Sequence, residues 1–135
     1  MVIGMADLHN PNITPPPREL PQVILRIKKV YHCWLALHRD FPRVERLGLG
    51  QKIEHNFLDL LELTFSAAYL PIEPKIIQLS RAISKLDVLR FFIQLAWEGK
   101  LLPTEKYSVL LAQLGEIGRQ LGGWRKGLQT KTPQR

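Results

Sequence analysis

The chain has 135 residues, of which 45% are hydrophobic and 23% are charged, and its formal net charge is +7. This length is typical of one domain with one core, and the composition excludes global disorder. Charged residues interrupt every apolar run before it reaches the ~18 residues of a membrane span, and the first residues lack the basic and apolar segments of a signal peptide. We therefore expect a cytoplasmic protein without a membrane helix.

A proline-rich segment occupies residues 1–20 and contains Pro11, Pro15, Pro16 and Pro17. Proline removes amide donors and favours extended polyproline geometry. We expect this segment to be a flexible, solvated N-terminal arm; the alternative is a recognition peptide.

The first helix is predicted over residues 21–40. Pro21 suits an initial helical turn, and Pro42 ends the helix, since the residue before a proline avoids the α region. Apolar residues alternate spacings of four and three, as in the seam of a helical bundle. The residues of this seam are Val23, Ile27, Val30, Trp34, Leu37 and Phe41.

The second helix is predicted over residues 43–69, with irregular first turns around Gly48 and Gly50. Its inward residues are Leu49, Ile53, Phe57, Leu60, Leu61, Thr64 and Ala68. Pro71 and Pro74 then stop this helix and begin the third, over residues 74–97, whose positive dipole end lies near Glu73. Gly99 is expected to close the third helix as a left-handed residue.

The fourth helix is predicted from Pro103-Thr104-Glu105 to Gly122-Gly123, followed by a short basic tail over residues 127–135. An interior glycine costs roughly 1 kcal/mol against alanine. We therefore expect Gly115, Gly118 and Gly122 to mark a close approach of this helix to a neighbour, within the chain or in another subunit. Four amphipathic helices with short connections predict an up-down-up-down bundle over residues 21–126.

Three motifs carry a family resemblance over about residues 21–126. They are Leu47-Gly-Leu-Gly-Gln-Lys-Ile-Glu54, Lys85-Leu-Asp-x-x-Arg90 and Glu116-Ile-Gly-Arg-x-Leu-Gly-Gly-Trp124. Together they resemble the four-helix-bundle family that includes the accessory variability determinant of diversity-generating retroelements; proteins encoded in intervening sequences of large-subunit ribosomal RNA genes look like close relatives. The resemblance implies a small, basic, non-catalytic bundle that assembles as a ring-like homopentamer and serves a reverse transcriptase copying a template RNA.

The charges are unevenly spread along the chain. No acidic residue lies between Glu19 and Asp40 or after Glu116, whereas residues 53–73 contain four acids and no Lys or Arg. A basic surface is typical of nucleic-acid binding; the alternative is solubility and the pairing of basic and acidic faces between subunits. The candidate phosphate- or partner-binding residues are Arg26, Lys28, Lys29, Arg81, Lys85, Arg119, Arg125 and Lys126.

Some of these residues fall into pairs that share a helix face. Arg81 and Lys85 lie four residues apart, as do Lys28 and His32, and each pair concentrates positive charge. Asp87 and Arg90 lie three apart and are expected to pair or to serve a helix or subunit contact.

No catalytic or metal-binding pattern is found in the sequence. Di-iron bundles need Glu-x-x-His pairs, which are absent, and His32 and His38 lie six residues apart and so do not share a helix face. Phosphate-loop and nucleophile-elbow motifs are also absent. The single cysteine, Cys33, excludes an intrachain disulfide, and we expect it to be partly buried. We expect no enzymatic activity, cofactor or metal.

Trp97 and Trp124 each stand near a helix end. Tryptophan can stack on bases, but in this position it more often plugs a core, which is the interpretation favoured here. The sequence thus predicts an accessory protein that binds a reverse transcriptase and RNA or DNA, by resemblance, during mutagenic copying. The alternative is a structural or protein-interaction module without a retroelement role.

Overall fold

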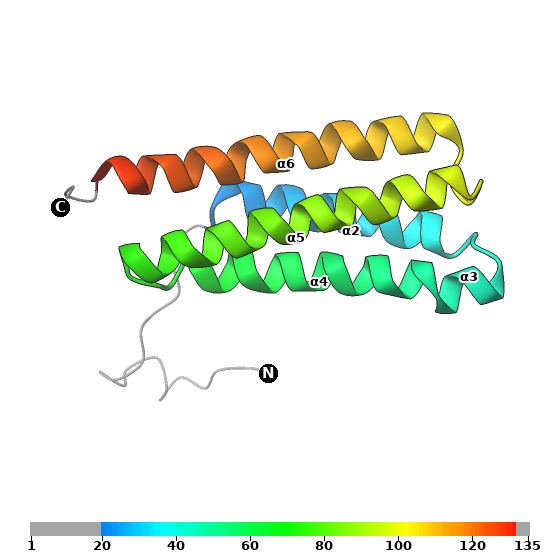
Figure 1. Cartoon of the computed structure of the whole chain (residues 1–135), viewed down its shortest axis with the longest axis horizontal. Helices are drawn as coiled ribbons and strands as arrows, with labels where there is room; N and C mark the ends of the chain where they lie inside the picture. Colours follow the sequence, from blue (N-terminus) through cyan, green and yellow to red (C-terminus); the bar gives the residue numbers. More distant parts are fainter. Residues whose placement is uncertain (1–19, 132–135) are drawn as a thin grey trace.

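The structure, a computed structural model, describes residues 20–131; the predicted arm (but for Leu20) and the last four residues of the predicted tail lie outside this range. Its helices are α2 (Gln22–His38), α3 (Arg43–Leu47), α4 (Leu49–Ala67), α5 (Ile72–Glu98) and α6 (Thr104–Lys131). No strand occurs among these residues. The four long helices alternate in direction (Figure 1). The predicted all-α four-helix bundle is confirmed.

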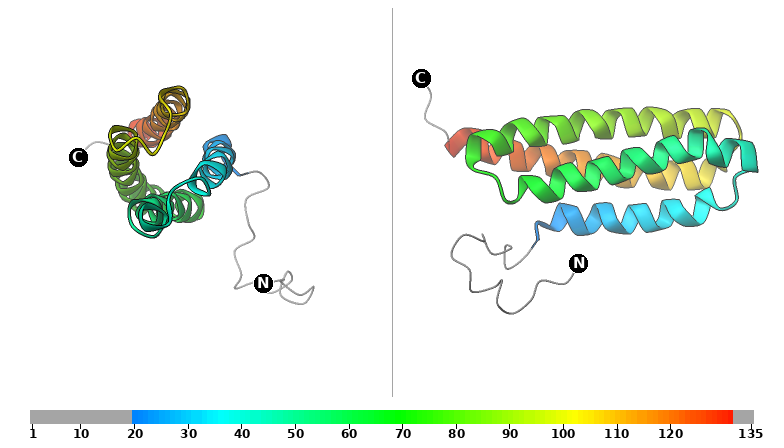
Figure 2. Two further views of the ribbon diagram at one scale, coloured as in Figure 1. Left: turned by 90° about the vertical axis from the view of Figure 1, so that its right-hand side faces the viewer. Right: turned by 90° about the horizontal axis from the view of Figure 1, so that it is seen from below.

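Around the bundle the helices follow one another as α2, α4, α5 and α6 (Figure 2). The α4–α5 and α5–α6 contacts are the most extensive, and α2 packs less extensively on α4 and α6. Thus α5 is flanked on both sides by helices that it contacts closely, with α2 across the core.

Proline marks the start of four of the helices. Pro21, Pro42, Pro71 and Pro103 each stand immediately before a helix. The carbonyls of the last three accept the first helical hydrogen bonds, from Arg46, Lys75 and Tyr107, at N–O distances of 2.8, 2.9 and 3.0 Å. A proline cannot continue a preceding helix, but its fixed φ suits the turn that opens the next one. These residues therefore set both the ends and the starts of the helices.

The core is formed by one inward stripe from each long helix. Trp34 and Phe57 are its largest fully buried residues, and their rings stack with centroids 6.1 Å apart. Most of the predicted inward residues of the first two helices are buried. Leu37, Leu49 and Leu61 are only partly buried, and at the end of α4 Ala67 is fully buried in place of Ala68, which is partly exposed. The buried residues of α5 are Leu79, Ala82, Leu86, Leu89, Ile93 and Ala96.

The predicted second helix is broken at Gly48 into α3 and α4, where the sequence indicated irregular turns. His38, at the end of α2, fills the space between α2 and the break between α3 and α4. Its Nε2 lies 2.9 Å from the Arg46 carbonyl oxygen, and its ring stacks on Trp34 at 5.2 Å. A Cβ at Gly50 would collide with the same imidazole, so this glycine is required by close packing.

Two predicted helix ends are wrong. The left-handed residue after α5 is Lys100, with a φ of 62°, whereas Gly99 has a φ of −79° and continues the right-handed turn. Helix α6 does not end at Gly122-Gly123 but continues to Lys131, so residues 127–131 of the predicted tail are helical. A glycine lowers helix stability without imposing an end, and Leu128, on the far side of these glycines, still packs on the core.

Within the chain, the expected close approach along α6 is found at one of the three glycines named for it. A Cβ at Gly118 would lie 3.2 Å from Leu86 Cδ2, whereas a Cβ at Gly115, Gly122 or Gly123 would meet no atom within 4 Å. Of these four glycines, only Gly118 therefore brings the α6 backbone close to a side chain of α5.

Two glycine substitutions should change stability in opposite directions. Gly50→Ala should lower the free energy of unfolding by about 1–3 kcal/mol, because the methyl group displaces His38. Gly123→Ala, at an exposed helical site with open space, should raise it by about 0.5–1 kcal/mol. Urea unfolding followed by circular dichroism measures both, and a Gly50→Ala protein as stable as the parent would contradict the packing described for His38.

Candidate functional site

All eight cations predicted to bind phosphate or a partner lie toward one end of the bundle, which we call the basic end. They lie in the first half of α2, in the second half of α6 and, on α5, in the first half at Arg81 and at the midpoint at Lys85. Two observations join these segments: the Arg125 guanidinium donates a hydrogen bond to Ser80 Oγ on α5 at 3.2 Å, and Trp124 lines a hollow together with Pro21 and Val23. The bundle therefore gathers residues that the sequence separates by up to 100 positions.

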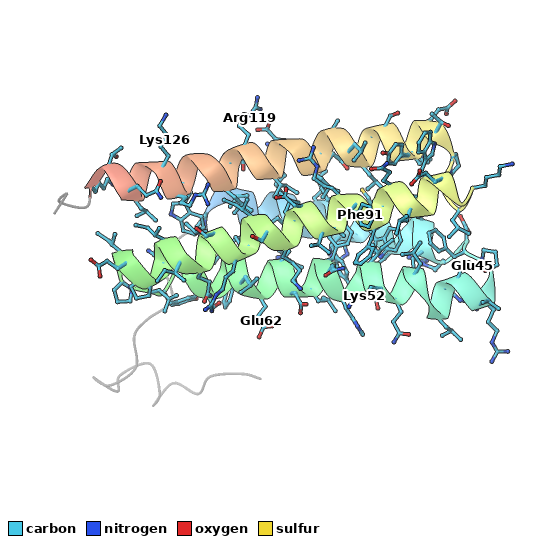
Figure 3. All side chains as sticks on the ribbon, in the orientation of Figure 1. Glu45, Lys52, Glu62, Phe91, Arg119 and Lys126 are labelled. Atoms are coloured by element: carbon cyan, nitrogen blue, oxygen red, sulfur yellow. The ribbon has the colours of Figure 1, made fainter. Side chains whose placement is uncertain are left out.

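Four of these cations are exposed and take part in none of the ion pairs found among residues 20–131: Lys28, Lys29, Arg81 and Lys126. Arg119 is also exposed, but it pairs with Glu116 on its own helix. Both Arg119 and Lys126 project from α6 away from the other helices (Figure 3).

The remaining three are held by the bundle. The Nζ of Lys85 lies 3.3 Å from Asp59 Oδ2 on α4, and Arg125 is half-buried over Ser80. Arg26 is half-buried too, and its Nε is buried without a hydrogen-bond partner among the described residues. These residues position the helices more than they offer charge to a ligand.

Helix α2 carries the most uniformly basic surface of the four long helices. It contains no acidic residue, and Lys28, Lys29 and His32 are all exposed. Tyr31, on the side that meets α4, has its pKa raised above the usual value by removal from water and, secondly, by the negative charge of Glu54. Its phenol therefore stays neutral at physiological pH and adds no negative charge to this surface.

Helix α5 is apolar on two opposite sides. One stripe builds the core, and a second faces outward with Ile77, Val88, Phe91 and Leu95 at 57, 43, 55 and 37% exposure. Sequence analysis missed this outer stripe, although the signal was present: with Arg81 and Ser84, these residues alternate spacings of four and three. The N-terminal part of this outer stripe forms a shallow groove. The groove is lined by Ile76, Ile77, Ser80, Arg81, Ser84, Lys85 and Val88.

The outer face of α4 is apolar and acidic. Leu58 and Phe65 are 43 and 45% exposed, Phe65 packs on Tyr69 with ring centroids 5.3 Å apart, and Glu62 stands between them. Figure 3 shows Glu62 projecting from α4 away from the bundle. Of the four acids that the sequence singled out, this face carries Glu62; Glu54 lies beside His38, Asp59 pairs with Lys85, and Glu73 is in the first turn of α5.

The expected pairing of Asp87 with Arg90 is not found among the ion pairs of the described residues. Both side chains are exposed and line a small hollow with Phe91 and Tyr107 between α5 and α6. On an isolated surface their mutual attraction is too weak to fix one geometry.

Trp97 and Trp124 both pack against the core, as the core-plug interpretation predicted, although Trp124 lies within α6 and not at its end. Trp97 stacks on Tyr107 at 4.6 Å and donates a hydrogen bond from Nε1 to Thr104 Oγ1, and Trp124 is half-buried against the core. Cys33 is exposed rather than partly buried, because it lies on the α2 side facing a groove toward α6.

Over residues 20–131, no cluster of three or more histidine, cysteine or acidic side chains is placed to hold a metal ion. No helix in this range has the length and apolarity to cross a membrane. The features that stand out are therefore surfaces: the basic end, the outer stripe of α5 and the acidic face of α4.

Comparison with known families agrees with this arrangement. The model of the bAvd-like family, the bacterial accessory variability determinants, matches residues 23–128, from the start of α2 nearly to the end of α6. The chain belongs to the bAvd-like family. Comparison of this chain with the curated proteins and with the solved structures found no match. The suspected resemblance is thus confirmed, and the bAvd-like family is one of accessory, non-catalytic proteins.

In this bAvd-like protein the Lys85–Asp59 ion pair should contribute little to stability. Both side chains are partly exposed, so a double-mutant cycle with Lys85→Ala and Asp59→Ala should give a coupling energy of about 0.2–1 kcal/mol. Urea unfolding of the four proteins measures it. A coupling several times larger would show that the pair, and not the apolar contact beneath it, holds α4 to α5.

Proposed function

We propose that this bAvd-like protein is a non-catalytic accessory protein of a diversity-generating retroelement. In this proposal it works in the cytoplasm as a ring-like homopentamer, and it binds the reverse transcriptase and the template RNA or its cDNA through the basic end. Family membership and the exposed lysines of α2 and α6 that lie outside the ion pairs of residues 20–131, Lys28, Lys29 and Lys126, support the proposal.

The single observation that carries the nucleic-acid part is the acid-free outer face of α2 at the basic end. Lysines there contact phosphates without a competing carboxylate, and each phosphate neutralised adds a salt-dependent increment to binding. A homopentamer repeats this face five times, so weak sites combine into a strong one. No base-reading motif is present, and the protein therefore recognises charge and backbone shape more than sequence.

A second function, that of a protein-interaction module without a retroelement role, is favoured by a different observation. The outer stripe of α5 exposes four large apolar residues, which is typical of a protein contact surface. The two functions are distinguished by the partner that the basic end recruits.

Direct binding to the enzyme is tested by co-purification with the reverse transcriptase encoded nearest to this gene. We expect retention after nuclease treatment and progressive loss as salt rises, because the contact is between oppositely charged surfaces. Loss of the enzyme after nuclease treatment would reduce the proposal to an RNA-bridged association, and no retention under any condition would contradict it.

The role of α2 is tested by reversing two of its charges. Lys28→Glu/Lys29→Glu should weaken binding of a single-stranded RNA by about tenfold or more and reduce the slope of log K against log salt by about 1–2, because about two phosphate contacts are lost. Fluorescence anisotropy over a salt series measures both quantities.

The matched control reverses two exposed lysines at the opposite end, Lys52→Glu/Lys106→Glu, and so gives the same net charge. We expect this control to bind RNA within about threefold of the parent protein, since only long-range attraction is changed and salt screens it. Equal losses in the two variants would show that overall charge, not the basic end, determines binding.

A further inference from the structure

We infer that the outer face of α5 packs on the outer face of α4 of a second copy of this chain. The inference rests on the proposed self-assembly and assigns the surfaces that make it. Each subunit then offers two different surfaces, so the contact is heterologous, the kind that generates rings.

The α5 face has the form of a helix-packing seam without a partner. Ile77, Val88, Phe91 and Leu95 are spaced as in a coiled coil, and two of them are more than half exposed. Arg81 stands within the stripe, exposed and outside the ion pairs of residues 20–131. An occupant that matches this face needs an apolar stripe of its own, interrupted by a carboxylate.

The α4 face has these properties. Leu58 and Phe65 are each more than two-fifths exposed, and Glu62 lies between them. Glu62 is outside the ion pairs of the described residues, and no Lys or Arg occurs from Ile53 to Glu73. A contact between the α4 faces of two copies would place carboxylates together, so the charges favour a contact of α4 with α5 over one of α4 with α4.

The register of this contact follows from two contacts inside the chain. Lys85 pairs with Asp59, and Gln78 donates a hydrogen bond to Ser66, so these residues of the antiparallel helices lie at equal heights along the bundle. Arg81 lies midway between Gln78 and Lys85, and Glu62 lies midway between Asp59 and Ser66.

If the copies are related by rotation about an axis parallel to the helices, each residue has the same height along that axis in every copy. Arg81 of one subunit then lies level with Glu62 of the next, Ile77 level with Phe65 and Tyr69, and Val88 level with Leu58. One register thus places the opposite charges, and two of the four apolar residues of the α5 stripe, level with matching residues of α4. Such agreement across both kinds of contact is the property expected of an interface.

The two faces lie on neighbouring helices of the bundle and not on opposite sides of it (Figure 2). A heterologous contact between adjacent faces turns in the same direction at each step, so the chain of subunits closes on itself and does not extend as a straight filament. The α4–α5 edge then faces the axis of the ring. Helices α2 and α6, with Lys28, Lys29 and Lys126, remain on its outside.

The test uses Arg81→Glu and Glu62→Arg, alone and mixed. Each variant places like charges across the contact. Its association constant, measured by sedimentation velocity over a concentration series, should be at least about tenfold lower than that of the parent. An equimolar mixture should form larger species than either variant alone, because every contact between unlike variants again joins opposite charges. A ring with an odd number of subunits keeps one mismatched contact, so this recovery is incomplete.

The mixture also separates this interface from a pairing of Arg81 with Glu62 inside one chain, which mixing cannot restore. The matched control is Lys126→Glu mixed with Glu105→Arg, two exposed charges on α6, and it should assemble as the parent does. Parent-like assembly of both single variants, or no gain on mixing, would overturn the assignment of these faces while leaving self-assembly intact.

A parent protein that is monomeric at every concentration would overturn the inference and the proposed homopentamer together. Retention of the reverse transcriptase after nuclease treatment would be unaffected by that result.

Discussion

Helix α5 is the element on which the rest of the structure depends, because it is apolar on two opposite sides. Its inner stripe, from Leu79 to Ala96, contributes six buried residues to the core, and the helix contacts both α4 and α6. Its outer stripe leaves Ile77 and Phe91 more than half exposed. Burying a side chain of this size stabilises a contact by roughly 1.5–3 kcal/mol. The same helix therefore stabilises the subunit through its inner stripe and favours association of subunits through its outer stripe.

The surfaces divide between two tasks in this account. Adjacent faces of α4 and α5 carry complementary charge and apolar residues, which suits contact between copies. The outer sides of α2 and α6 carry unpaired lysines, which suits contact with phosphate or an acidic protein. Because the bundle places the first pair of helices on one side and the second pair on the other, assembly leaves the basic surfaces free and multiplies them.

Most of the fold could be predicted from the sequence, because prolines and periodicity act locally. Pro103 precedes the start of α6, as predicted, and the seam from Val23 to Trp34 has one regular spacing; α5 begins at Ile72, two residues before the predicted start at Pro74. The end of α6 could not be predicted in this way. Packing of Leu128 on the core outweighs the glycines before it, and that contact depends on the tertiary arrangement.

The candidate site was predictable as a set of residue types and not as a geometry. Charge counting found the basic ends of the chain, but only the folded bundle distinguishes Lys28, which is exposed, from Lys85, which is paired with Asp59. The outer stripe of α5 escaped detection because two apolar faces on one helix resemble a uniformly buried helix when a single sequence is considered. His38, which closes the α2–α4 corner, was weighed only as a metal ligand, because its partners come from two other helices.

The central claim is that this small bundle works as an assembly and not as a single subunit. Native mass spectrometry of the full chain, from nanomolar to micromolar concentration, measures the number of copies directly. A predominant species of five subunits is the predicted result. A monomer throughout that range, with the outer stripe of α5 left uncovered, would contradict the account.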